Sequence, residues 1–117
     1  YDELPEQYER LAAALGELGL AYIHLVSYER VGETLNHAMK RAFGGTIIVN
    51  GGLDRKKAEA ALAAGLGDLA AFATSFLANP DLPHRLRHGL PLNAPDSATF
   101  YTPGERGYID YPFAQPV

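Results

Sequence analysis

The stretch from residue 46 to residue 79 constrains the fold most, because it holds two apolar runs that are each followed by a turn and a helix-like pattern. The first run, 46–49, leads into the turn at 50–52, and the second, 69–73, leads into the turn at 73–75. Parallel strands place their carboxyl ends at the same edge of a sheet. We therefore expect the two turns to lie side by side, where their backbone N–H groups converge on a phosphate.

Two helices and one strand are predicted before this stretch. Apolar residues at helical spacing over 4–18 predict an amphipathic helix whose apolar stripe lies on a sheet. The run AYIHLVS at 21–27 lacks strict polar alternation, which is typical of a strand covered on both faces. A second helix over 35–42 is closed by Gly44 and Gly45.

Two further helices follow the second and third strands. Asp54 is placed to cap the third helix, and Gly65 to supply its left-handed end. Asp81 caps the fourth helix, and the residues after Gly89, rich in proline, glycine and tyrosine, form an ordered irregular tail. On the third helix, Ala58, Ala61 and Leu62 are expected to face inward, and the fourth helix carries Leu82 and Leu86.

The spacing of the strands predicts the fold class. Strands that begin near 21, 46 and 69 are about 25 and 23 residues apart, which fits βα units with short loops. A TIM (βα)8 barrel has eight strands and about 250 residues. The sequence therefore predicts either an open α/β layer with exposed strand edges or, as we favour, a partial barrel. This barrel would comprise the last three βα units and the tail, as a single unit over residues 1–117.

Composition narrows the classes of function. The net charge of −4 and the isoelectric point near 5.5 give no broad basic surface for nucleic acid or an anionic membrane. The absence of cysteine excludes a disulfide framework and a thiolate metal site. No apolar run approaches the roughly 20 residues of a membrane helix. A cytoplasmic location follows by default.

The phosphate hypothesis rests on small residues at the two turns. Gly51 and Gly52 carry no side chain that would keep an anion from the amides, and Thr74 and Ser75 add hydroxyl donors at a helix start. The alternative is that the glycines form a plain strand-to-helix turn. The nearest basic residues, at 55–57, are expected to face solvent.

The four histidines give no convincing metal site. His84 and His88 have the i, i+4 spacing of two ligands on one helix face, but no third ligand accompanies them, so a surface pair is favoured. His24 is interpreted as a core residue, and His37 as a solvated one.

No catalytic group is assigned from the residues alone. The carboxylates of the tail, Asp96, Glu105 and Asp110, do not lie on one rigid element, and no serine has a histidine partner in a recognisable motif. The tail is also rich in aromatic residues, which either pack over a core or wall a pocket for a flat ring. Its aromatic residues are Phe100, Tyr101, Tyr108, Tyr111 and Phe113, and core packing is favoured for the last three.

The order of short motifs along the chain resembles one family. VNGGLD, and then FLANPDLP, RL, PLN, TFY and GYIDYP, follow one another as in the carboxy-terminal part of the Old Yellow Enzyme family. The resemblance covers nearly the whole chain. It implies a TIM barrel that takes a hydride from NAD(P)H onto FMN and passes it to the β-carbon of an activated alkene.

The resemblance also assigns residues to the cofactor phosphate. It places Gly51 and Gly52 at the loop whose backbone meets the FMN phosphate. Ala73 and Thr74 stand at the same phosphate, where the family usually has glycine and arginine. This departure removes a guanidinium fork and leaves backbone amides and the Thr74 hydroxyl.

The aromatic pair belongs to the other end of the flavin. The resemblance places Phe100 near the flavin ring and Tyr101 at the substrate entrance, beside TPGERG, where a more glycine-rich loop is common. The family's substrate-binding and proton-donating residues come from earlier strands that are not in this chain. The expected partners are therefore NAD(P)H, an activated alkene and the missing barrel segment.

Two other functions compete with this reading. One is a non-catalytic barrel fragment without cofactor, whose open strand edges pair with a second copy of the chain. The other is a different phosphate-binding TIM-barrel enzyme.

Overall fold

The computed structural model describes residues 3–26 and 31–115, and the internal contacts divide the chain into two compact units. Unit 1 is Tyr1–Ala71 and unit 2 is Phe72–Val117, and each is described by itself. The expectation of a single unit over residues 1–117 stays a prediction.

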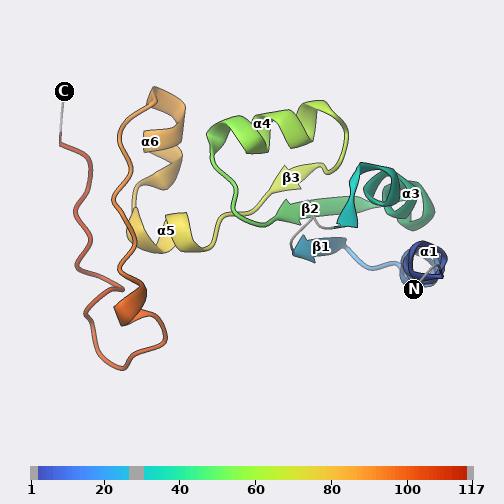
Figure 1. The fold of residues 1–117 in the computed structure, drawn as a ribbon, viewed down its shortest axis with the longest axis horizontal. Helices are drawn as coiled ribbons and strands as arrows, with labels where there is room; N and C mark the ends of the chain where they lie inside the picture. Colours follow the sequence, from blue (N-terminus) through green and yellow to red (C-terminus); the bar gives the residue numbers. More distant parts are fainter. Residues whose placement is uncertain (1–2, 27–30, 116–117) are drawn as a thin grey trace. The chain divides into compact units, whose positions relative to one another are not determined.

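Unit 1 contains a parallel sheet in the order β1-β2-β3 (Figure 1). Its strands are β1 Tyr22–Val26, β2 Thr46–Asn50 and β3 Leu69–Ala70. In the register, Val49 lies opposite Leu25 on one side and Ala70 on the other. The predicted α/β class and the parallel order are confirmed. The third strand is shorter than the predicted 69–73, because strand pairing ends with the bond from the Ala71 N–H to the Val49 carbonyl.

Three helices of unit 1 follow the predicted pattern. They are α1 Leu4–Glu17, α3 Glu33–Phe43 and α4 Arg55–Ala63. Asp54 caps α4, since its carboxylate accepts the Lys57 N–H at 2.7 Å. Gly44 and Gly65 have φ of 71° and 72°, the left-handed values expected where α3 and α4 end.

The core of unit 1 lies on one face of the sheet. Leu25, Ile47 and Val49 share this face by their register and are buried. Helices α3 and α4 contribute the buried residues Met39, Phe43, Ala58 and Ala61 to the core. Leu62 does not belong to it: the residue is 39% exposed, so its predicted inward position is wrong.

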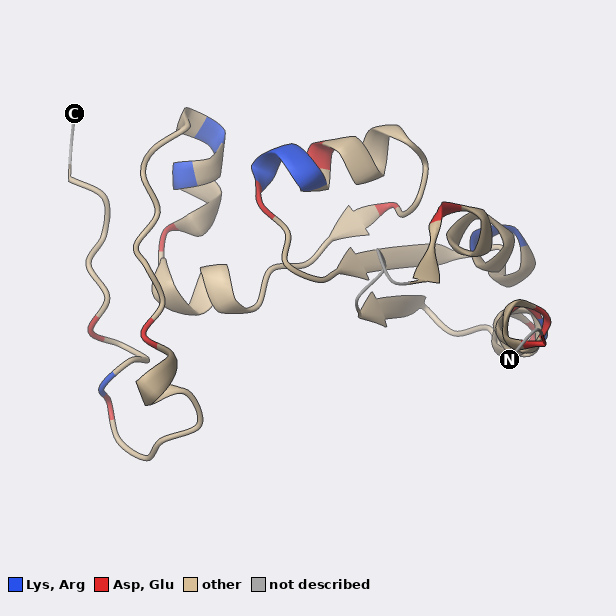
Figure 2. Ribbon diagram, in the orientation of Figure 1, with Lys and Arg blue, Asp and Glu red and all other residues tan. Residues whose placement is uncertain are grey.

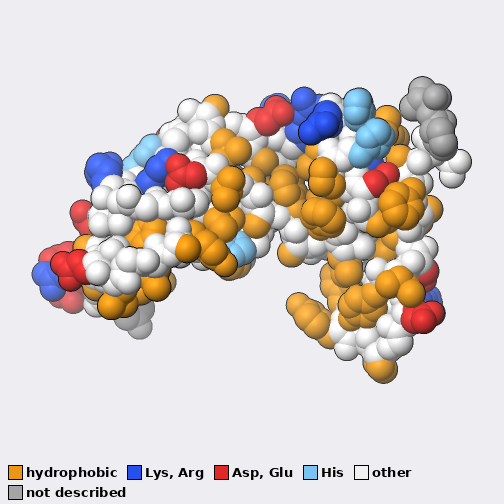
Figure 3. Space-filling view, turned by 180° about the vertical axis from the view of Figure 1, so that it is seen from behind, with side chains coloured by type: hydrophobic (Ala, Val, Ile, Leu, Met, Phe, Trp, Pro, Cys, Tyr) orange, Lys and Arg blue, Asp and Glu red, His pale blue; other side chains and the backbone are white. Residues whose placement is uncertain are grey.

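The other face of the sheet is open among the described residues. Tyr22, His24 and Val26 alternate with the buried positions of β1, and all three are exposed, Val26 by 67%. The prediction of a strand covered on both faces is therefore wrong for this chain. The predicted core position of His24 is wrong for the same reason. Hydrophobic side chains open to solvent are visible in Figure 3.

Helix α1 packs on a helix instead of on the sheet. The buried Ala12 and the close approach of Gly16 to Phe43 set this contact, since a Cβ on Gly16 would lie 2.5 Å from the Phe43 carbonyl oxygen. The apolar stripe predicted to lie on a sheet is largely exposed, with Leu18 at 73%. Its other exposed members are Leu4, Tyr8 and Leu11.

Unit 2 consists of two short helices and a long irregular segment. The helices are α5 Thr74–Ala78 and α6 Leu82–His88, and a single 3-10 turn, η1, spans Ser97–Thr99. Leu82 is buried and Leu86 is half-buried. The irregular tail is confirmed as ordered backbone through residue 115. None of the helices in the described part of the chain is long and apolar enough to cross a bilayer.

Asp68 ties the sheet to α3. One carboxylate oxygen accepts the Ile47 N–H at 2.9 Å, and the other lies 3.0 Å from the Lys40 ammonium. The hydrogen bond from Ile47 and then the contact with Lys40 lower the pKa of Asp68 below its ordinary value. A carboxyl with a lowered folded-state pKa stabilises the fold above its unfolded pKa, and this contribution is lost as the pH falls through the folded value.

We expect Asp68→Asn to lower the free energy of unfolding by about 1 kcal/mol at pH 7, a modest figure because the carboxylate is partly exposed and screened. The gap between wild type and variant should shrink below about pH 4, where the wild-type carboxyl is protonated too. Urea unfolding at pH 7 and pH 3 measures both values. The control is Glu59→Gln, which breaks only the exposed pair with Arg55. An equal gap at the two pH values would contradict the prediction.

Candidate functional site

The turn after β2 has the backbone that an anion site needs. Gly51 has φ of 132° and Gly52 has φ of 58°, values that side-chain-bearing residues adopt rarely. A Cβ on Gly52 would meet no heavy atom of the described residues within 4 Å, so these residues leave the space in front of it open. Leu53 is buried directly after the turn and anchors it to the core.

The residues of the second predicted turn lie near the start of unit 2. Ala73 is the N-cap of α5 and Thr74 its first residue, and both are exposed. Ala73 has no side-chain oxygen, so it cannot accept a hydrogen bond from the first backbone N–H groups of α5 as a capping residue would. Because Gly51 and Gly52 belong to unit 1, the convergence of both turns on one phosphate stays a prediction.

Basic side chains near the glycine turn lie on α4. Figure 2 shows basic residues, in blue, along the first turn of this helix, directly after an acidic position in red. Arg55, Lys56 and Lys57 are all exposed, as predicted. Arg55 donates to Glu59 at 2.8 Å, so part of its charge is already compensated.

The aromatic pair lies in one irregular loop of unit 2. Phe100 follows η1 and is half-buried, whereas Tyr101 is 99% exposed and has φ of 59°. A left-handed φ is uncommon for tyrosine and costs about 1–2 kcal/mol. Such a conformation persists only where the surrounding structure holds it.

The remaining aromatic residues of the tail do not form a core. Tyr108 and Phe113 are exposed, so the packing role predicted for them is wrong among the described residues. Tyr111 is half-buried and acts through its hydroxyl, which accepts the Asp96 N–H at 2.8 Å.

A polar network that was not predicted from the sequence connects α6 with the two ends of this loop. Arg85 is 4% exposed, and its guanidinium donates to the Asp81 carboxylate at 2.7 Å and to the carbonyls of Pro91 and Pro112 at 2.7 and 2.8 Å. Asn93 donates to the Pro112 carbonyl at 2.8 Å as well. The sequence contained one signal of this network: Asp81, the predicted cap, and Arg85 have the i, i+4 spacing of an ion pair on one helix face.

Asp81 serves this network and not the helix end. It occupies the N-cap position of α6, but its side chain makes no hydrogen bond to the first turn among the described residues, which corrects the predicted cap. The carboxylate instead accepts from Arg85 and from the Ala114 N–H at 2.8 Å. Burial alone raises the pKa of Asp81, but these hydrogen bonds outweigh it and leave the pKa below its ordinary value.

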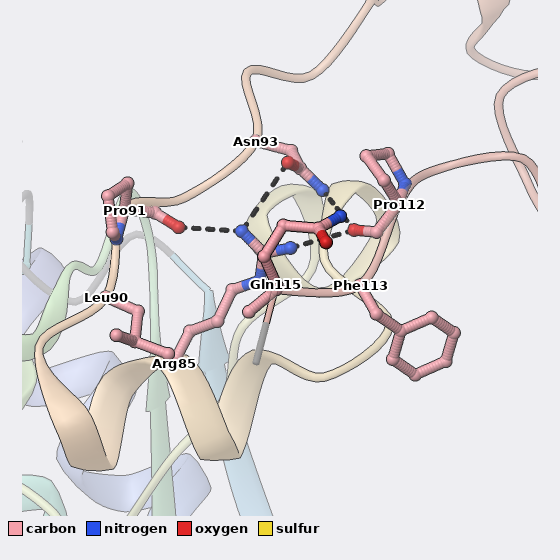
Figure 4. A pocket seen from close by; sticks show the side chains of 8 residues that line it. Arg85, Leu90, Pro91, Asn93, Pro112, Phe113 and Gln115 are labelled. Carbon is pink, nitrogen blue, oxygen red and sulfur yellow. Dashed lines mark hydrogen bonds between the residues drawn. The ribbon is translucent and has the colours of Figure 1, made fainter. Parts of the chain in front are cut away.

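Arg85 and Asn93, but not Asp81, border an open cavity of about 530 Å³ (Figure 4). The guanidinium of Arg85 lies between two extended segments that include Leu90–Asn93 and Pro112–Gln115. The Arg85 guanidinium donates to the Pro91 and Pro112 carbonyls. It is therefore already engaged by protein groups and is not available to bind a ligand in the cavity.

The histidine pair and the carboxylates of the tail form no metal centre. His84 and His88 are exposed with ring centroids 4.6 Å apart. Among the described residues, no group of three or more histidine, aspartate or glutamate side chains could hold a metal ion.

Comparison with known proteins places this arrangement in a family. No family model matches the chain. It is 44% identical over 118 residues to the putative 12-oxophytodienoate reductase 12 of Oryza sativa subsp. japonica, an alignment that covers 88% of this chain and 29% of that protein. It is 39% identical over 109 residues to a 12-oxophytodienoate reductase-like protein of Solanum lycopersicum, covering 90% of this chain and 30% of that protein.

Solved structures agree with the sequence comparison. A structure of morphinone reductase in complex with tetrahydroNAD matches with a TM-score of 0.89 and 41% identity, over 97% of this chain and 31% of that one. The chain thus spans less than a third of the length of these relatives. The predicted partial barrel is confirmed, because the matched structures are TIM barrels. The chain belongs to the Old Yellow Enzyme family, as a carboxy-terminal part of its barrel.

Proposed function

We propose that this chain is the FMN-binding segment of an NAD(P)H-dependent ene-reductase, with phosphate-binding loops and part of the pocket wall as its contribution. The observation that carries the proposal is the match over 97% of the chain to a reductase structure that holds a nicotinamide analogue. The chain's own chemistry is binding and orientation. None of the residues assigned above is a catalytic group, and such groups would come from the rest of the barrel.

The glycine turn fits the phosphate of FMN. Gly51 and Gly52 have backbone angles that few other residues adopt, and no described residue fills the space in front of Gly52. Backbone amides of such a turn can donate to phosphate oxygens without side-chain obstruction. The hydroxyl of the exposed Thr74 is a further donor, where the family usually supplies a guanidinium.

The aromatic pair fits a flat ring and its substrate. Phe100 is half-buried and offers an apolar wall to the flavin, and Tyr101 projects fully into solvent, where it can border the substrate entrance. When bound, FMN would supply hydride transfer from the nicotinamide to the β-carbon of an activated alkene. The loop's part is to shape the pocket and exclude water.

The rest of the barrel is the partner that unit 1 fits. The open face of the sheet carries Tyr22, Val26 and Leu69, and the outer edges of β1 and β3 are unpaired among the described strands. A closed barrel covers such a face with side chains from its other strands and leaves no edge. The alternative function remains a self-associating barrel fragment without cofactor, supported by the same exposed surface and by the missing arginine. A cytoplasmic location stays a prediction.

Co-expression with the amino-terminal barrel segment of a 12-oxophytodienoate reductase tests the proposed function. We expect a yellow complex that binds FMN and oxidises NADPH when an enone is added. The control is the same complex with Gly51→Val and Gly52→Val, which blocks the turn and should lose the flavin. A colourless complex would contradict the proposal.

The oligomeric state of the chain alone tests the alternative. A fragment whose edges pair with a second copy should elute as a dimer, with a mass measured by light scattering that falls on dilution. A monomer at all concentrations would refute this alternative.

Restoring the family's arginine should strengthen cofactor binding. We expect Thr74→Arg to lower the Kd for FMN in the completed barrel by about 10- to 100-fold, because hydrogen bonds to charged groups contribute about 1.5–3 kcal/mol. Thr74→Gln, similar in length but uncharged, is the matched control and should change the Kd little. Flavin fluorescence quenching measures both constants. Equal effects of the two variants would contradict a phosphate at this position.

A further inference from the structure

We propose that Arg85 is a positioning residue that, together with Asn93, fixes the loop over residues 94–111. This loop, here called the aromatic loop, carries Phe100 and Tyr101. Neither Arg85 nor Asn93 has a place in the cofactor contacts assigned above. The consequence for catalysis rests on the proposed function, whereas the effect on the loop does not.

Arg85 joins the two ends of the aromatic loop. Its guanidinium donates to the Pro91 carbonyl before the loop and to the Pro112 carbonyl after it, at 2.7 and 2.8 Å (Figure 4). The Arg85 Nε–H donates to the Asp81 carboxylate at 2.7 Å, and this carboxylate compensates the buried positive charge. One planar side chain on a helix therefore sets the separation of two chain segments.

Asn93 makes the junction specific. Its side-chain amide donates to the Ala78 carbonyl at 2.9 Å and to the Pro112 carbonyl at 2.8 Å. Its backbone N–H donates at 2.7 Å to the side chain of Asn79, which is fully buried. Leaving a buried amide without a hydrogen-bond partner destabilises the folded state. This set of bonds therefore favours one arrangement of the loop ends.

The interior of the aromatic loop is stiff enough to pass this arrangement on to its tip. A Cβ on Gly107 would lie 2.0 Å from the Thr99 hydroxyl oxygen, so the first and second halves of the loop are in direct contact there. The Asp96 N–H donates to the Tyr111 hydroxyl at 2.8 Å across the loop. The Thr102 hydroxyl donates to the Thr99 carbonyl at 2.7 Å and closes the turn that contains Tyr101.

Tyr101 shows why such support is needed. It is fully exposed, so burial gives it no stabilisation, and its φ of 59° is strained. The loop bonds on either side of it must compensate for this cost. Loosening the loop ends at Arg85 should therefore let Tyr101 relax to an ordinary backbone conformation and leave its position at the pocket entrance.

Hydrogen exchange on the full 117-residue chain tests the first part. Arg85→Lys keeps a charge for Asp81 but has no planar fork to bridge two carbonyls. We expect the bonded amides of Phe100, Thr102 and Gly107 to exchange about tenfold faster, with those of α6 unchanged. Arg87→Lys, the same substitution at an exposed position of that helix, is the control.

A second variant guards against loss of folding. Asn93→Ala removes the two bonds that its side chain donates and the longer one, at 3.5 Å, that it accepts from Arg85. The bonds from Arg85 to Asp81, Pro91 and Pro112 remain, so the variant should raise loop exchange by a smaller factor. Faster exchange confined to the loop in both variants supports the proposal. Unchanged loop exchange in both, or equal acceleration throughout unit 2, overturns it.

Steady-state kinetics of the completed barrel tests the catalytic consequence. We expect Arg85→Lys to raise KM for an enone by about 5- to 10-fold at unchanged flavin content, because the glycine turn proposed to hold the FMN phosphate does not belong to the aromatic loop. An unchanged KM overturns the positioning role. Flavin missing from the wild-type complex would refute the proposed function, and the exchange experiment would still decide the effect of Arg85 on the loop.

Discussion

The parallel pairing of β2 with both of its neighbours is the interaction on which unit 1 depends. It brings Leu25, Val49 and Ala70 into one row and so gives the helices a face to cover. The same pairing aligns the ends of β1 and β2, and the glycine turn follows β2 directly. Because strand residues alternate between faces, the row opposite the helix-covered one needs a second cover. No described segment supplies that cover, so Tyr22, Val26 and Leu69 are exposed.

Unit 2 is organised by polar bonds more than by apolar burial. Its helices are short, and the buried residues include Asn79, Arg85 and Thr99 beside Leu82 and Ala78. A buried guanidinium needs all of its partners, because an unpaired buried charge is strongly destabilising. Few other loop conformations would satisfy all of these hydrogen bonds. The network therefore favours one conformation of the long loop that carries Phe100 and Tyr101.

The candidate site was predictable in part. The small residues at Gly51 and Gly52 and the helix cap at Asp54 followed from local rules, and the backbone angles and the Asp54 bond bear out the local geometry. The motifs identified the family, which the comparisons confirmed. The network around Arg85 was not predictable, since its acceptors at Pro91 and Pro112 are backbone carbonyls with no signature in the sequence.

The sequence by itself determined the order of helices and strands, their parallel arrangement and most of their ends, because hydrophobic spacing, caps and glycines act over a few residues. Only the tertiary structure decided which predicted inward residues are covered. His24, Leu62 and the stripe of α1 have core-like spacing, yet they are exposed where no described segment packs over them. Arg85 has the chemistry of a surface residue and is buried where the chain around Pro91 and the more distant chain around Pro112 meet at its guanidinium. Burial depends on segments far apart in the chain, and periodicity carries no information about them.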